Sequence, residues 1–124
     1  VLDLRSGVLF AGGLIDVQRV PDIQDGELPG WRRALAALRE LGAHTVVPGH
    51  GRASPAPAAI AAVQDYFDRL EDRARTLVAR GVSLIDVPEA SELPAYQAWD
   101  QYETIHRRNA SIAFLRAERE TLLK

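Results

Sequence analysis

Strand-like and helix-like segments alternate in the first part of the chain, and this order limits the fold more than any other property of the sequence. Apolar and β-branched residues over 1–4, 8–11 and 44–47 predict short strands. Apolar residues at helical spacing predict helices over 31–41 and 54–80. Strand, helix and strand in this order are typical of layered domains, so we expect an α/β fold with short strands followed by long helices.

The first strands and the connections around them carry clear turn signals. Arg5-Ser6-Gly7 lies between the first two strands, which predicts a hairpin. Residues 16–30 combine prolines, glycines and acids, which predicts an irregular surface loop. The helix that begins at Trp31 is expected to end before Gly42.

Two further helices are predicted in the second part of the chain. Ser54 as N-cap and Pro55 in the first turn indicate a helix that should run to Arg80. Its expected core positions follow the helical period: Ile60, Val63, Phe67, Leu70, Ala74 and Leu77. Residues 82–98 contain two prolines and predict a linker or a short helical turn. The last helix is expected over 99–123, with these residues near one face: Tyr102, Ile105, Ile112 and Leu115.

The composition excludes several classes of partner and ligand. The formal net charge is −2 and acids are interleaved with bases, so we expect no nucleic-acid partner. The chain has no cysteine, which excludes thiolate metal sites and leaves His, Asp and Glu as possible ligands. No apolar run approaches the ~20 residues that a bilayer requires. We therefore expect no membrane partner and a soluble protein of the cytoplasm or the periplasm.

His50 is the strongest candidate for a metal ligand. It lies between Gly49 and Gly51, directly after an apolar strand and just before a predicted helix. Layered α/β domains collect their sites at the carboxyl ends of strands, and glycine neighbours allow the sharp turn that exposes an imidazole. A neutral imidazole nitrogen is a good zinc donor. The alternative, a histidine that only fills a tight turn, fits these residues equally well.

Two segments joined by a predicted helix resemble the second half of metallo-β-lactamase superfamily domains. They are Val8-Leu9-Phe10-Ala11-Gly12-Gly13-Leu14 and Thr45-Val46-Val47-Pro48-Gly49-His50-Gly51. The resemblance is close over residues 1–53 and follows the later helices only in outline. It implies the C-terminal half of an αβ/βα sandwich and a zinc-dependent hydrolase with a metal-activated water. It also implies that His50 is the last histidine ligand. The Gly-Gly pair and the acidic segment 20–26 are similar to the branch called quinoprotein relay system zinc metallohydrolases.

Two departures from the family pattern change what is expected of the site. The first-half motif His-Xaa-His-Xaa-Asp-His does not occur, and a catalytic zinc needs about three protein ligands, so this segment alone should be inactive. Gly13 stands where the family has a bridging aspartate. We therefore expect one zinc ion in the intact protein rather than two, unless Asp16 or Asp22 supplies the missing carboxylate.

The remaining polar candidates carry weaker signals. Arg52 and Ser54 precede a predicted helix start, whose N–H groups attract anions, and are candidates to orient an acidic substrate group. A plain N-cap with a solvated arginine is the alternative. His106 shares a helical face with Asn109 and is expected to be a packing residue, and His44 is expected to be structural or exposed.

The whole chain, 1–124, is expected to form one unit. Residues 1–53 would carry the metal-ligand turn and residues 54–124 the helical portion. The chain lacks methionine and begins directly on a strand-like segment, which suggests a piece of a longer protein; a native start with its methionine removed is the alternative.

Half a sandwich leaves an apolar sheet face uncovered, so the expected partners are the N-terminal half of the domain or a second copy of the chain, and a small-molecule substrate. The rival interpretation is a non-catalytic dimerisation or binding module.

Overall fold

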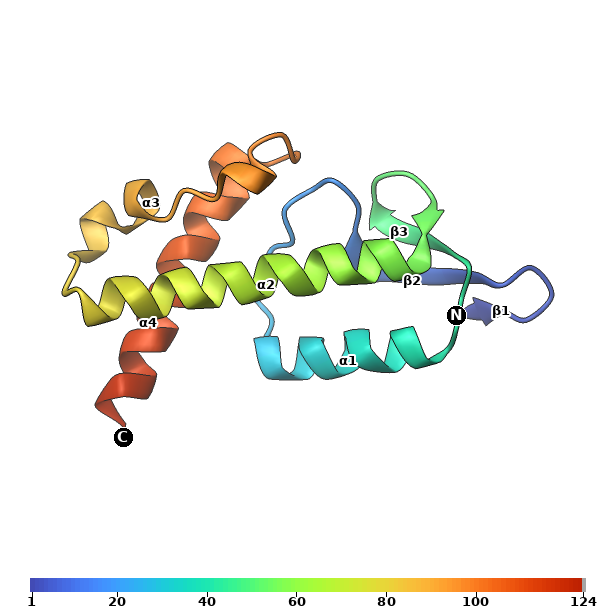
Figure 1. Cartoon of the computed structure of the whole chain (residues 1–124), viewed down its shortest axis with the longest axis horizontal. Coiled ribbons are helices and arrows are strands. Elements are labelled where there is room, and N and C mark those ends of the chain that lie inside the picture. Colours follow the sequence, from blue (N-terminus) through green and yellow to red (C-terminus); the bar gives the residue numbers. More distant parts are fainter. Residues whose placement is uncertain (124) are drawn as a thin grey trace.

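The computed structural model describes residues 1–123 and combines a small mixed sheet with four α-helices, which confirms the α/β class (Figure 1). The strands are β1 (Leu2–Asp3), β2 (Val8–Asp16), β3 (Thr45–His50) and β4 (Ser54–Pro55). The helices are α1 (Leu28–Glu40), α2 (Ala56–Ala79), α3 (Val87–Ala90) and α4 (Arg107–Leu122). Among these residues, no helix has both the length and the apolar character needed to cross a membrane.

The four strands lie in the sheet in their sequence order. β1 pairs antiparallel with β2, so the predicted hairpin is confirmed. β2 pairs in parallel with β3 after a crossover through α1, which is the strand, helix and strand unit that the sequence predicts. β4 returns antiparallel to β3 and pairs Ser54 with Val46.

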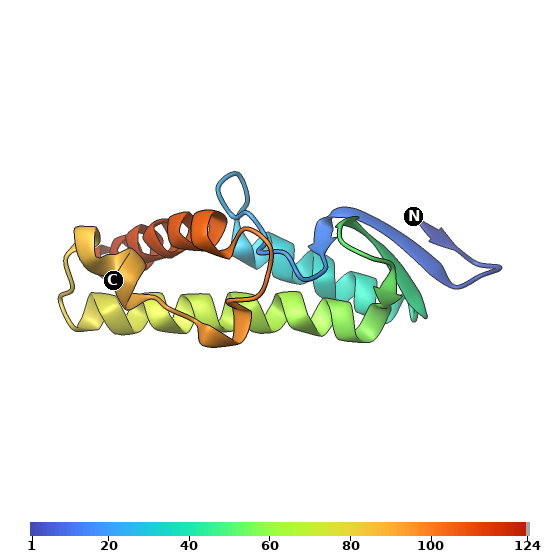
Figure 2. The ribbon, with the colours of Figure 1, turned by 90° about the horizontal axis from the view of Figure 1, so that it is seen from above.

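The helices cover one face of this sheet. α1 and α2 lie on the same side of the strands in Figure 2, and the register partners Leu9 and Val46 are buried. On the other face Phe10 is 53% exposed, and no helix within residues 1–123 covers it. The sheet therefore has one covered face and one open, partly apolar face.

The long helix α2 runs from the sheet end of the molecule to the helical end (Figure 1). All the predicted core positions on it are buried: Ile60, Val63, Phe67, Leu70, Ala74 and Leu77. The ring of Phe67 meets Trp31 of α1 edge-on, with centroids 4.9 Å apart. Arg32 of α1 pairs with Asp68 and Glu71 of α2 at the rim of the same contact. The core stripe predicted for this helix is thus confirmed.

The predicted N-cap of α2 is wrong. Ser54 lies in β4, and its hydroxyl donates a hydrogen bond to the carbonyl oxygen of Arg52 at 2.8 Å. Pro55 occupies the N-cap position and makes no side-chain cap bond. Pairing with β3 fixes the extended backbone of these residues, so the strand takes the place of the capping turn that the local sequence favours.

The loop predicted over residues 16–30 is shorter in the structure. Asp16 is the last residue of β2, and α1 begins at Leu28 rather than at Trp31. Pro29 lies in the first turn of α1, where its missing N–H has no helical partner to lose. β3 likewise extends past the predicted strand end to His50, so both parallel strands reach further toward the loop than expected.

The last helix begins with a π-helical turn, Tyr102–His106, ahead of α4. A π-helical turn closes its hydrogen bonds over five residues instead of four, and the extra residue rotates the helix face that follows. Leu115 is consequently 47% exposed, and its predicted place on the packed face is wrong. The buried positions after the turn are Asn109, Ala110, Ala113, Phe114 and Ala117.

His106 lies at the centre of a buried hydrogen-bond network. Its Nε2 is 2.9 Å from the carbonyl oxygen of Ser91, which only accepts, so Nε2 carries the hydrogen and Nδ1 accepts from the Tyr66 hydroxyl at 2.8 Å. Asn109 donates to the Tyr66 oxygen and to the carbonyl oxygen of Pro21. Burial lowers the pKa of His106, which keeps the ring neutral. Both ring nitrogens make hydrogen bonds inside the protein, in agreement with the packing role predicted for His106.

Candidate metal centre

β2 and β3 end side by side, and this brings Asp16 next to His50. The two strands are parallel, so their carboxyl ends meet at one edge of the sheet, and the register pairs Asp16 with His50. The pairing is irregular around Gly12, where β2 shifts its register against β3. His50 therefore lies at the carboxyl edge of the sheet, where the sequence places it.

The close approach of β2 and β3 requires glycine on both sides of His50. A Cβ atom added to Gly49 would lie 2.8 Å from the carbonyl oxygen of Gly12. Gly51 has a φ of +104°, and a Cβ there would lie 2.4 Å from the carbonyl oxygen of Val17. Any larger residue at either position would clash with β2 or the residue after it. His50 is consequently the one side chain that this turn can present between its two glycines.

A single carboxylate oxygen of Asp16 holds the His50 ring. Asp16 Oδ1 accepts a hydrogen bond from the backbone N–H of His50 at 3.1 Å and lies 3.1 Å from His50 Nδ1. Because a carboxylate only accepts, Nδ1 carries a hydrogen, and in the neutral ring Nε2 keeps its lone pair. The Asp16 side chain is 13% exposed, whereas that of His50 is 59% exposed. The ring is thus oriented from its buried side and open on the other.

The pair does not amount to a complete zinc site. No group of three His, Asp or Glu residues that could hold a metal ion occurs within residues 1–123. A catalytic zinc needs about three protein ligands and a water. The donors that lie together, one imidazole and one carboxylate, fit only part of a zinc site.

Only one of the two acids predicted to replace the missing bridge lies beside His50. Asp22 pairs with Arg108 of α4 and accepts a hydrogen bond from the Gln24 N–H, so its carboxylate is engaged at another surface. Gly13 itself has open space around it: an added Cβ would meet nothing within 4 Å. The backbone at Gly13 therefore leaves room for a carboxylate side chain.

The weaker candidates form no second site. Ser54 lies in β4, two residues before α2 begins at Ala56, and it lines the pocket described below. Arg52 is exposed and takes part in no ion pair within residues 1–123. His44 is exposed and its ring lies against Gly7, where an added Cβ would be 2.6 Å from its Cδ2 atom. The structural or exposed role expected of His44 agrees with this position.

A pocket beside Asp16 is a feature that the sequence analysis missed. Its polar rim includes Asp16, Gln18 and Ser54, and its apolar wall includes Trp99. Trp99 is brought there by a backbone hydrogen bond from the N–H of Asp100 to the carbonyl oxygen of Gln18 at 2.8 Å. No local pattern indicates this pocket, because its walls come from segments far apart in the sequence.

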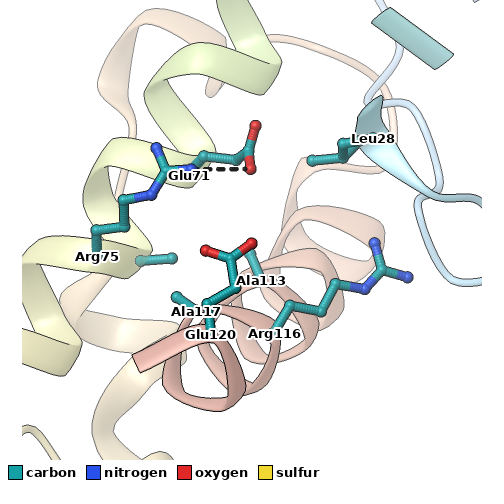
Figure 3. Close-up of a pocket in the computed structure, with 8 residues that line it drawn as sticks. Leu28, Glu71, Arg75, Ala113, Arg116, Ala117 and Glu120 are labelled. Carbon is teal, nitrogen blue, oxygen red and sulfur yellow. Dashed lines mark ion pairs between the residues drawn. The ribbon is translucent and has the colours of Figure 1, made fainter. Parts of the chain in front are cut away.

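Another pocket lies between α2 and α4 and shares no lining residue with the first (Figure 3). Its rim carries both signs of charge, with Glu71 and Arg75 paired at 3.5 Å and Glu120 on α4. Arg116 Nη2 donates to the carbonyl oxygen of Ile23 at 3.1 Å, while Nη1 is buried without a hydrogen-bond partner within residues 1–123. These residues join α4 to α2 and to the loop before α1, and we assign them to helix packing.

The candidate centre therefore consists of an exposed imidazole, a mostly buried carboxylate that orients it, and a pocket beside the carboxylate. An imidazole held in this way can bind a metal ion through Nε2 or exchange a proton. In comparisons with known proteins, no family model and no curated protein matches the chain.

Proposed function

We propose that the chain supplies one part of a zinc centre that hydrolyses a small-molecule substrate, with His50 as a ligand through Nε2. The observation that carries this proposal is the contact between His50 Nδ1 and Asp16 Oδ1 on an otherwise exposed ring. Histidines that bind metals almost always donate their other ring N–H to a carboxylate, a carbonyl or a water. A histidine that only filled a tight turn would need no such partner.

The other zinc ligands would come from outside this chain. In the superfamily that the sequence resembles, they lie in the first half of the domain, whose sheet completes the sandwich. The open sheet face around Phe10 offers a surface against which that half, or a second copy of the chain, can pack. One missing layer of the sandwich would thus explain both the incomplete set of zinc ligands and the uncovered sheet face.

The chemistry that zinc supplies when bound is a water whose pKa falls toward neutrality and whose hydroxide attacks a carbonyl or ester carbon. Asp16 acts in this chain as a positioning residue, because its Oδ1 already accepts from two N–H groups of His50. It fixes the ring orientation and keeps the hydrogen on Nδ1, so that Nε2 is the donor atom. Gly13 provides no bridging carboxylate, which favours one zinc ion over two.

At pH 8, where an imidazole is neutral, we expect the His50 ring of the metal-free chain to carry its hydrogen on Nδ1. The nitrogen chemical shifts of the ring measure this by NMR. Asp16→Ala should end the predominance of that form, and the matched variant Asp22→Ala should not, because Asp22 pairs with Arg108 instead. Added Zn²⁺ should shift the Nε2 signal of His50 more than that of His44. A hydrogen on Nε2 in the unmodified chain, or an equal zinc response from both histidines, would contradict the proposal.

The open sheet face also favours a second candidate function, a non-catalytic dimerisation module. Phe10 is 53% exposed on this face, and Val1 and Leu4 of the hairpin are 91% and 88% exposed. Contiguous exposed apolar surface marks interaction sites in proteins that fold as monomers. Under this candidate, pairing through the sheet is the function and His50 binds no metal.

We expect the chain to form a dimer or a larger species at micromolar concentration, because association covers the open face. Light scattering measures the molar mass. Phe10→Asp should shift the chain toward the monomer, whereas Leu115→Asp on the exposed side of α4 should leave the mass unchanged. A monomeric wild-type chain that binds no dye for apolar surface would count against both the missing layer and the module.

A further inference from the structure

On the basis of the proposed function, we infer that the pocket beside Asp16 binds a small uncharged aromatic group of the substrate. The pocket has a cavity volume of about 210 Å³ and is partly open to solvent. A closed apolar cavity of about 150 Å³ is known to hold benzene, so a ring of that size has room here. The pocket borders the carboxylate that contacts His50, which places it next to the proposed reaction.

The walls suit a flat apolar ring. Trp99 lines the pocket, and its indole is braced edge-on by Tyr96, with ring centroids 4.6 Å apart. Ala58 and Ala62, one helical turn apart on α2, also line the pocket, and their small side chains leave its volume unfilled. Aromatic rings pair well with an indole in offset or edge-on arrangements, so the walls favour an aromatic occupant over a polar one.

The rim is held in place without a ligand. Gln18 has a left-handed φ of 54°, a costly conformation for a residue other than glycine. It is maintained by the hydrogen bond from the Asp100 N–H to the Gln18 carbonyl oxygen and by the Arg19–Asp100 ion pair at 3.2 Å. These contacts fix Asp100, the residue after Trp99, against the segment that follows β2. The pocket is therefore formed in the free protein.

The charge of the rim selects against anionic ligands. Asp16 is the one acidic or basic residue that lines the pocket. Gln18 and Ser54 add neutral polar groups. An uncharged ring with a polar substituent thus fits better than an aromatic carboxylate, and the substituent would point toward the edge that carries His50.

The test is an NMR titration of the metal-free chain with benzyl alcohol. The Trp99 indole N–H and the Ala62 methyl signals should shift together, with a Kd of about 1–10 mM for a ligand of this size. The Trp31 indole N–H, which donates to the Leu14 carbonyl oxygen at 3.0 Å, is an internal control that should not shift. Benzoate should bind about fivefold more weakly because its charge is like that of Asp16.

Two substitutions that fill the pocket complete the test. Ala62→Leu should abolish the shifts. If that variant fails to fold, Ala58→Leu, at an exposed position of α2, should abolish them instead. The matched control Ala79→Leu, at the exposed end of α2, should leave binding unchanged. His50→Ala should also leave ring binding unchanged, so the pocket and the metal ligand succeed or fail separately. Absence of a saturable shift at Trp99, or full binding in the filled variants, would overturn the inference.

Discussion

Replacing Phe67 with alanine is expected to lower the free energy of unfolding by about 3–5 kcal/mol. Phe67 is fully buried on α2, and its ring packs edge-on against Trp31 of α1. Its removal leaves a cavity at the contact between the two helices that cover the sheet. Since whole domains are stable by only about 5–15 kcal/mol, the loss is a large share of the total. Denaturation with urea measures it.

The control for this substitution is Leu115→Ala on α4. Leu115 is 47% exposed, so the expected cost is within about 0.5 kcal/mol. Equal costs for the two variants would mean that Phe67 contributes no more to the core than an exposed leucine does. A cost below about 1 kcal/mol for Phe67→Ala would place α2 outside the core and remove the basis for the described layers.

The elements that the sequence predicts well are those with a strong local period. The stripe of α2 repeats over about five turns, and no other face of that helix offers comparable apolar surface, so its burial follows from spacing. The hairpin and the parallel strand pair follow in the same way from turn residues and alternation. These features are fixed by residues close to one another in the chain.

The errors arise where distant contacts override a local preference. Ser54 has the character of an N-cap, but pairing with Val46 holds it in a strand. Leu115 continues the apolar spacing from Tyr102, but the π-helical turn shifts the face by one residue. The local sequence pattern indicates neither the strand partner of Ser54 nor the extra residue of the π-helical turn. Local propensity alone therefore predicts the wrong structure at both positions.

The candidate centre was predictable in part for the same reasons. His50 stands out because glycines flank it at a strand end, and Asp16 is the acid nearest to the end of the preceding strand. The structure brings the two together but gives Asp16 the position of a hydrogen-bond partner of the ring. The sequence does not indicate a role for Trp99, because Trp99 is brought to the pocket by the hydrogen bond between Asp100 and Gln18, which are far apart in the sequence.

The largest functional effect is expected in the zinc content of the chain when the segment or second copy that supplies the other ligands is present. Wild type should retain about one zinc ion per chain after dialysis, since one carboxylate bridge is missing. Gly13→Asp should raise the content toward two, because it restores the bridging carboxylate of the family that the sequence resembles, at a position where an added Cβ meets nothing within 4 Å. Two ions in the wild type would instead assign the bridging role to Asp16.

The most direct measurement is elemental analysis of His50→Ala beside His44→Ala. The account predicts that His50→Ala loses its zinc while its circular dichroism stays that of the wild type, because an exposed side chain between two glycines contributes little packing. His44→Ala, which removes an exposed histidine remote from Asp16 in the register of β2 and β3, should keep its zinc. Unchanged zinc in His50→Ala, with His44→Ala also unchanged, would exclude His50 from the metal centre and contradict the proposed function.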